Sequence, residues 1–311
     1  MDAIQAEILL EIVLHMDIKS MLQLKRVNKA FAQLISNYER SISVGHITRF
    51  PLPPSGNVLS SDQVNRRAIG FGTFEMVREL ERRDDRINWV YRMIAVDTMS
   101  FPPEVGLTND TQSQRFYLLV TRSIWQCDQI ADLTANRQDS GLLELNNPLS
   151  RPCQIDYIRR LPLEDIAMMY YLIDYLSTMF SYGHPDWSES DPELIERITV
   201  FEESVLRHGS WFLWAYFNED RTWKRSASKI LNLGMKELEE WEQGAEGTQP
   251  GLKQNVMRRF SELVRSRRHL TDKMYVIVRR TVLGTNETWV DSDDEGDEGN
   301  EVDQDDDDDD D

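Results

Sequence analysis

The side chains best suited to metal binding or acid–base catalysis are scattered along this 311-residue chain. The five histidines are His15, His46, His184, His208 and His269. No two of them have the spacing that places metal ligands on one face of a helix. The two cysteines, at positions 127 and 153, do not form a metal-binding or redox motif either. Phosphate-binding glycine loops, a G-x-S-x-G nucleophile elbow and an H-E-x-x-H motif do not occur in the sequence. The sequence therefore indicates no catalytic residue, no metal site and no cofactor.

Acidic side chains crowd the end of the sequence. Residues 291–311 contain fifteen Asp and Glu and no Lys or Arg, out of a formal net charge of −19 for the whole chain. The run begins like a calcium-binding EF-hand loop, with alternate acids at Asp291, Asp293 and Glu295. Val302 stands where such a loop needs its bidentate Glu. We therefore interpret the run as a disordered, charged tail, because it repels itself and has little apolar surface to bury.

Three roles are open for this acidic tail. Our preferred interpretation is a solubilising segment without a specific contact. It could also contact a basic partner, such as a histone or a ribosomal protein. A third role is to mask the protein's own basic segment between residues 258 and 280, which contains seven arginines. Pairing of exposed charges of that kind is weak and is screened by salt.

Aromatic residues gather between positions 211 and 217. Trp211 and Trp214 could line a pocket for a peptide or another ligand. Because the cluster has helical spacing, a place in the hydrophobic core is the more common outcome. We keep the two tryptophans as a weak candidate for substrate binding.

The first elements of the chain are more informative than these isolated groups. Ile4, Ile8 and Ile12 follow one another at four-residue spacing and form one stripe of a helix. Leu9 and other aliphatic residues widen this stripe beyond the arc that a surface helix needs to cover its own core. The excess apolar surface has to be buried against something else.

Two more short helices are expected directly after the first. Asp17 or Ser20 is suited to cap the second helix, and Asn28 the third. Three short helices in about 40 residues are at or below the size at which a chain supports its own core without disulfides, metals or a partner. The pattern therefore favours burial against another polypeptide.

This stretch resembles the F-box, the helical module by which substrate receptors bind the Skp adaptor of cullin-based ubiquitin ligases. The matching positions run from Glu7 to Ile35. Members of the family usually have Leu-Pro where this chain has Ile4 and Gln5, which implies weaker adaptor contact at the leading edge. The residues expected to supply the adaptor-binding apolar surface are Ile4, Ile8, Leu9, Ile12, Leu22, Leu24, Val27 and Phe31. The expected organisation is an F-box-like domain at residues 1–45, a proline-rich linker at 46–62, a helical domain at 63–288 and an acidic tail at 289–311.

Helical spacing predicts a mainly α fold for the rest of the chain. Helices are expected over residues 64–83, 87–98, 111–136, 163–182, 191–208, 210–217, 221–244 and 252–268. Only residues 274–278 and 281–283, which are rich in β-branched side chains, are more typical of strands. No repeat of fixed period is present, which argues against a repeat domain as the substrate-binding part.

The resemblance implies a non-catalytic receptor rather than an enzyme. It would bind a Skp-type adaptor and through it a cullin, and it would present an unidentified protein substrate for ubiquitination. On this hypothesis an Ile8→Asp change abolishes adaptor binding, whereas a charge change at Lys25, taken as exposed, has little effect. No run of 18 apolar residues is present to span a membrane, and no direct nucleic-acid contact is expected. The cysteine content fits the cytoplasm or the nucleus. The alternative is a helical scaffold or nuclear interaction protein whose acidic tail binds a basic partner.

Overall fold

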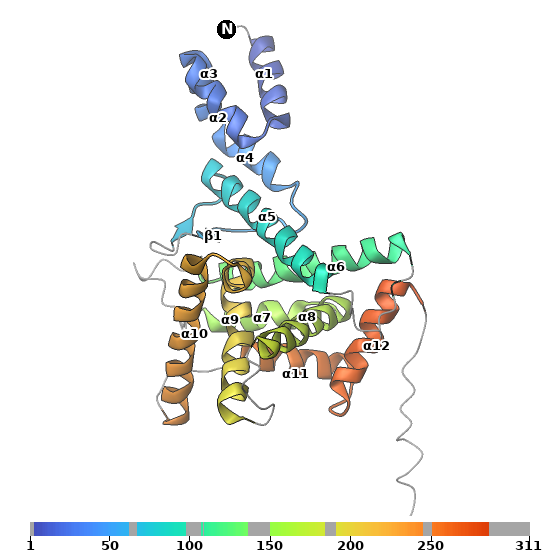
Figure 1. Ribbon diagram of the computed structural model, residues 1–311. Helices are drawn as coiled ribbons and strands as arrows, with labels where there is room; N and C mark the ends of the chain where they lie inside the picture. Colours follow the sequence, from blue (N-terminus) through green and yellow to red (C-terminus); the bar gives the residue numbers. More distant parts are fainter. Residues whose placement is uncertain are drawn as a thin grey trace, which may run out of the picture.

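The computed structural model describes residues 3–61, 67–97, 107, 109–135, 150–183, 191–244 and 251–285. Side chains are described for the same residues except 3–6 and 95–97. The predictions that concern the acidic tail, His184 and the side chain of Ile4 lie outside this part of the chain. The fold is mainly α-helical, as the sequence predicts (Figure 1).

Four short helices open the chain, and a long helix connects them to the body. They are α1 (Ala3–His15), α2 (Ile18–Val27), α3 (Lys29–Asn37), α4 (Glu39–Ile47) and α5 (Phe74–Asp97). A small antiparallel hairpin, β1 (Val58–Leu59) and β2 (Ala68–Ile69), lies between α4 and α5 in sequence, with Val58 opposite Ile69. Figure 1 shows α1 to α4 standing off from the body, with α5 running from them towards α6.

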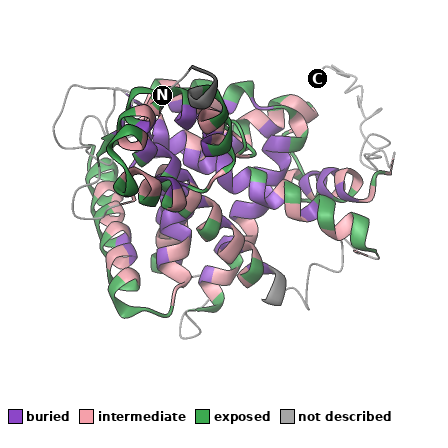
Figure 2. Ribbon diagram, turned by 90° about the horizontal axis from the view of Figure 1, so that it is seen from above, coloured by how far each residue is buried: buried purple, intermediate pink, exposed green. Residues whose placement is uncertain are grey.

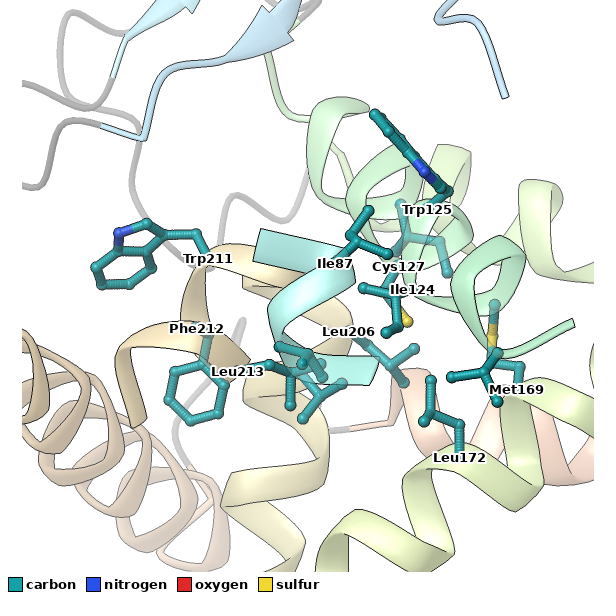
Figure 3. Close-up of a cluster of buried hydrophobic side chains, with 14 of the residues drawn as sticks. Ile87, Ile124, Trp125, Cys127, Met169, Leu172, Leu206, Trp211, Phe212 and Leu213 are labelled. Atoms are coloured by element: carbon teal, nitrogen blue, oxygen red, sulfur yellow. The ribbon is translucent and has the colours of Figure 1, made fainter. Parts of the chain in front are cut away.

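In the part of the chain that the structure describes, the body has seven further helices. They are α6 (Asp110–Asp132), α7 (Arg151–Arg160), α8 (Leu163–Tyr182), α9 (Pro192–Phe217), α10 (Arg221–Glu242), α11 (Leu252–Val264) and α12 (Leu270–Leu283). Helix α9 contacts α6 and α10, and α8 contacts α6, α11 and α12. Seen from above, the buried residues concentrate in the middle of the molecule (Figure 2). Figure 3 shows Ile87, Ile124, Leu172 and Leu206, from four different helices, meeting in this core.

Polar side chains set where several helices begin. Asp17 caps α2, because its carboxylate accepts the Ser20 amide at 2.7 Å. Asn28 caps α3 by accepting the Ala30 amide at 2.8 Å. Asp191 caps α9, with Pro192 in its first turn. The sequence correctly predicts the cap at Asn28 and a helix that begins at Asp191, and Asp17 is the cap of the two alternatives for α2.

Gly209 interrupts α9 but does not end the element. Its φ of 61° and ψ of −147° are not helical, and α9 continues beyond it to Phe217. A Cβ at this position would lie 2.0 Å from the Oδ1 of Asp128 on α6. Glycine is therefore required both by the backbone conformation and by the close approach of α6. The predicted break at this residue is correct, and it appears as a kink in one element.

The predicted strands at 274–278 and 281–283 are wrong, because both lie in α12. The β-branched residues there favour a strand locally, but Met274, Ile277 and Val278 have helical spacing and are buried in the core. Helix α5 is also one continuous element where two helices were expected, and it begins only at Phe74 because Ala68–Ile69 form β2. Helices α4 and α7 were not predicted.

Candidate functional site

Helix α1 packs through one side on α4. Val13 is buried, and Leu14 lies against Gly45 of α4, where an added Cβ would be only 2.8 Å from its Cδ2 atom. The guanidinium group of Arg49 donates a hydrogen bond to the carbonyl oxygen of Leu14, near the end of α1. Close packing at Gly45 and this contact to Arg49 fix the end of α1 on α4.

The other side of α1 exposes aliphatic side chains. Ile8 is 56% exposed and Ile12 is 50% exposed, and their four-residue spacing places them on one stripe of the helix. At the end of α2, Val27 is 76% exposed. We call Ile8, Ile12 and Val27 the N-terminal apolar surface. Ile8 and Ile12 belong to α1 and Val27 to the end of α2, so two helices of the unit that stands off from the body contribute to this surface (Figure 1).

The remaining candidate residues divide by burial. Leu22 and Leu24 are half-buried and pack against the hydrophobic core, so they contribute to internal packing. Leu9 and Phe31 are half-buried as well. The structure thus divides the candidate adaptor-binding residues into exposed ones and half-buried ones, a division that the sequence alone did not provide.

Lys25 is not the exposed residue that the sequence led us to expect. It is half-buried, and its ammonium group lies 5.6 Å from the ring centroid of Phe74 on α5. A cation over an aromatic ring is attracted to it, so a charge change at Lys25 would disturb the contact between α2 and α5. Lys25 is therefore unsuitable as a neutral control.

His46 is buried between α4 and α1, close to the positive charge of Arg49. His46 on α4 is buried, and burial together with the nearby Arg49 guanidinium lowers the pKa of His46. The neutral imidazole is the form that this packing favours. His15, by contrast, is exposed on α1 and lies 3.3 Å from Glu11.

The two candidate tryptophans have different surroundings. Trp211 is only 8% exposed and belongs to the core. Trp214 is half-buried, and the centroid of its ring lies 5.0 Å from the ring centroid of Trp223. The guanidinium carbon of Arg86 lies 5.8 Å from the centroid of Trp214. Figure 3 shows the indole of Trp211 apart from the aliphatic cluster around Ile124. Of the two, Trp214 is the residue that a ligand could reach from solvent.

A buried ion pair that the sequence did not reveal joins the hairpin to the body. Arg83 on α5 makes two hydrogen bonds to Asp132 on α6, at 2.7 and 2.8 Å, and both side chains are buried. Leu59 of β1 completes the group, since its carbonyl accepts from Arg83 and its amide donates to Asp132, each at 2.8 Å. The partners are 49 residues apart in sequence, so no local pattern could have indicated the pair.

The described residues offer no sign of a metal centre. No group of three or more His, Cys, Asp or Glu among them could hold a metal ion. Burial raises the pKa of Cys127, which disfavours the thiolate form. Within the same part of the chain, no helix has the length and apolar character needed to cross a bilayer.

Comparison with known proteins agrees with the geometry of the N-terminal helices. Residues 6–42 match the family model of the F-box domain. The chain therefore carries an F-box domain, the domain that defines F-box proteins. F-box domains bind Skp-type adaptors of ubiquitin ligase complexes, which supports an adaptor-binding role for these helices. No curated protein and no solved structure matches the chain.

Proposed function

We propose that this protein is a non-catalytic substrate receptor. Its F-box binds a Skp-type adaptor, which connects it to a cullin, and its helical body holds a protein substrate for ubiquitination. Proximity to the conjugating enzyme, supplied by the assembly, then accelerates the transfer. No residue of this chain takes part in the chemistry.

The observation that carries this proposal is the exposure of Ile8 and Ile12 inside a domain that matches the F-box. Val13, on the other side of the same helix, is buried, so α1 is oriented with one apolar side inward and another outward. Enclosing a fully exposed aliphatic side chain in an interface contributes about 1.5–3 kcal/mol of transfer free energy, and a half-exposed one contributes correspondingly less. An adaptor that covers the N-terminal apolar surface gains this energy from several side chains together.

The substrate would be held by the helical body. Trp214, with Trp223 and Arg86 beside it, is our candidate contact, because large aromatic side chains with a neighbouring cation are common in protein interfaces. Trp211 is enclosed and would support this region from beneath. The identity of the substrate does not follow from these contacts.

Co-purification with a Skp-type adaptor tests the proposal. Ile8→Asp places a carboxylate in the interface without a partner, and we expect it to remove the adaptor from the purified complex. The matched control is Leu118→Asp on α6, because Leu118 is 55% exposed against 56% for Ile8 and the chemical change is the same. Thermal unfolding of both variants establishes that each remains folded.

Full recovery of the adaptor with the Ile8→Asp protein would contradict the proposal. Equal loss with the Leu118→Asp protein would contradict the assignment of the surface to α1. Deletion of residues 1–45 is a less clean test, because it cuts through α4, whose Ile42 and Ile47 lie in the same core cluster as the body. Single substitutions at exposed positions leave that core intact.

A further inference from the structure

The end of α11 and the turn that follows it present a group of arginines. A surface pocket of about 570 Å³ is lined here by Arg258, Arg265 and Arg267, with Met257 and Leu270 as its apolar part. All three arginines are exposed, and they form no ion pair with any other described residue. Glu262 also lines the pocket, and it lies 3.7 Å from Arg259, which is not a lining residue. The pocket therefore has three available cations, and its one carboxylate is next to another arginine.

The backbone of this turn is held in an uncommon conformation. Arg265 and His269 have φ values of 53° and 52°, in the left-handed region that side-chain-bearing residues seldom adopt. Two serines fix it, since the Ser261 hydroxyl donates to the Ser266 carbonyl at 2.6 Å and the Ser266 hydroxyl donates to the Arg268 carbonyl at 3.1 Å. Arg265 and Arg267 are thus carried on a fixed turn, and Arg258 is carried on α11. A strained turn of this kind is a reason to look for a ligand there.

The distribution of charge along the chain indicates what kind of ligand would bind in this pocket. Residues 252–285 contain nine Lys and Arg and only two Asp and Glu, although the whole chain carries a formal charge of −19. Residues 291–311 contain fifteen acids and no base. The strongest negative segment of the sequence therefore follows directly after its strongest positive one. Opposite charges held this close in sequence meet at a high effective concentration.

The length of the connecting chain permits the contact. Thr285 is the last described residue, and the acidic run begins six residues later. The pocket lies at the start of α12, which has 14 residues and is therefore about 21 Å long. An extended chain reaches about 20 Å at Asp291 and about 90 Å at Asp311 when counted from Thr285. Nearly all of the acidic residues can therefore return to the pocket.

We propose that residues 291–311 bind in cis to the pocket formed by Arg258, Arg265 and Arg267. The carboxylates neutralise the three guanidinium groups, and the occupied pocket is closed to other acidic ligands. This proposal does not depend on adaptor binding. It assigns to the acidic run a contact within its own chain instead of a purely solubilising role or a basic partner.

The test uses full-length protein and a fluorescent peptide of residues 291–311 as the probe. In one version of the chain, the fifteen acids of the tail are replaced by Asn and Gln, which keeps its length. We expect the peptide to bind this neutral-tail chain at low salt, and to bind the unaltered chain about tenfold or more weakly, because the attached tail already occupies the site. Binding should fall steeply as salt is raised.

The site is located with two matched triple substitutions in the neutral-tail chain. Arg258→Gln, Arg265→Gln and Arg267→Gln should reduce peptide affinity about tenfold, because three charge contacts are lost. The control is Arg221→Gln, Lys224→Gln and Arg225→Gln on α10, which removes the same charge from three exposed positions. Circular dichroism establishes that each protein is folded.

Several results would overturn the proposal. The first is equal binding of the peptide to the unaltered and the neutral-tail chains. The second is an equal loss of affinity in the two triple variants, which would mean that the peptide responds to overall charge only. The third is that a single-stranded oligonucleotide binds through the same arginines with equal affinity for the unaltered and the neutral-tail chains. The pocket would then be a site for a different polyanion and not for the tail.

Discussion

The F-box helices and the helical body contain similar apolar residues but bury them to different extents. Ile8 and Ile12 are about half exposed, whereas Ile124, Leu206 and Phe212 of the body are fully enclosed. The body surrounds each stripe with several long helices, such as α6, α8 and α9. Around α1 the described chain provides mainly α4. An apolar stripe thus becomes core where enough helices surround it and remains exposed where they do not.

The same comparison extends to charged groups. In the body, Arg83 and Asp132 are buried and make hydrogen bonds to each other and to the backbone of Leu59. In the F-box helices, the pair of Glu11 and His15 is exposed. Removing a partner from a buried pair leaves an uncompensated charge, while an exposed pair contributes little. Substitutions in the two regions should therefore differ in size and in what they affect.

The largest effect should come from the body core. Phe212→Ala removes a fully enclosed ring that packs near Phe201, with ring centroids 5.6 Å apart. We expect it to lower the free energy of unfolding by about 3–5 kcal/mol, because it leaves a cavity. The half-exposed Ile8→Ala should cost less than about 1 kcal/mol. Urea denaturation measures both, and a similar cost for the two would remove the distinction between the regions.

The buried ion pair should have an effect of comparable size. Asp132→Ala leaves the guanidinium group of Arg83 enclosed without its two-bond partner, beside the Leu59 carbonyl, the Glu79 carboxylate at 3.5 Å and the charge of Asp128. We expect a loss of about 3–5 kcal/mol in the free energy of unfolding. The double variant Arg83→Leu, Asp132→Leu should recover part of it, since the enclosed guanidinium group is removed together with its carboxylate partner. A double variant that is less stable than Asp132→Ala would contradict this explanation.

Helix capping in the F-box should have a smaller effect. Asn28→Ala removes the acceptor for the Ala30 amide and should cost about 1 kcal/mol. Asn28→Asp keeps an acceptor at the same place and serves as the control. Thermal unfolding checks the difference. If Asn28→Ala and Asn28→Asp unfold at the same temperature, the cap does not stabilise α3.

The smallest effect should be a pH dependence at the contact between α1 and α4. The pKa of His46 is lowered in the folded protein by burial and by Arg49, although Asp17 acts in the opposite direction. The unfolded chain then binds more protons near its ordinary pKa of about 6.5, so stability is present above this pH and is lost as the pH falls through it. Fluorescence-monitored unfolding between about pH 7.5 and 5.5 should show a larger decrease for the unaltered chain than for His46→Gln. Equal pH dependence in the two proteins would contradict this role for His46.

Local patterns were sufficient to predict most of the helices, and a family resemblance indicated the F-box. Capping residues such as Asn28 and Asp191 act on amides two residues away, and apolar stripes such as Ile8 and Ile12 repeat within one helix. These interactions are contained in short segments, so the sequence shows them directly. The same reasoning explains why the kink at Gly209 could be located.

Features that depend on distant residues were not predictable in this way. The strand preference of residues 274–278 was overridden because α12 packs on α8, more than eighty residues earlier. The sequence around Arg83 does not indicate its partner Asp132. Lys25 was expected to be exposed, but it lies over the ring of Phe74. For the proposed adaptor-binding surface, the sequence indicated which helices to consider, but burial was needed to distinguish Ile8 and Ile12 from Leu22 and Leu24. Tertiary contacts, which no local pattern encodes, account for each of these differences.

We expect a Skp-type adaptor to cover the outward side of α1. Hydrogen–deuterium exchange of the full chain, measured with and without purified adaptor, tests it most directly. We expect slower exchange on adaptor binding within residues 6–42, including the segment that contains Ile8 and Ile12, and unchanged exchange in α8 and α9. Slower exchange confined to the body, with α1 unaffected at saturating adaptor, would mean that the adaptor does not cover α1.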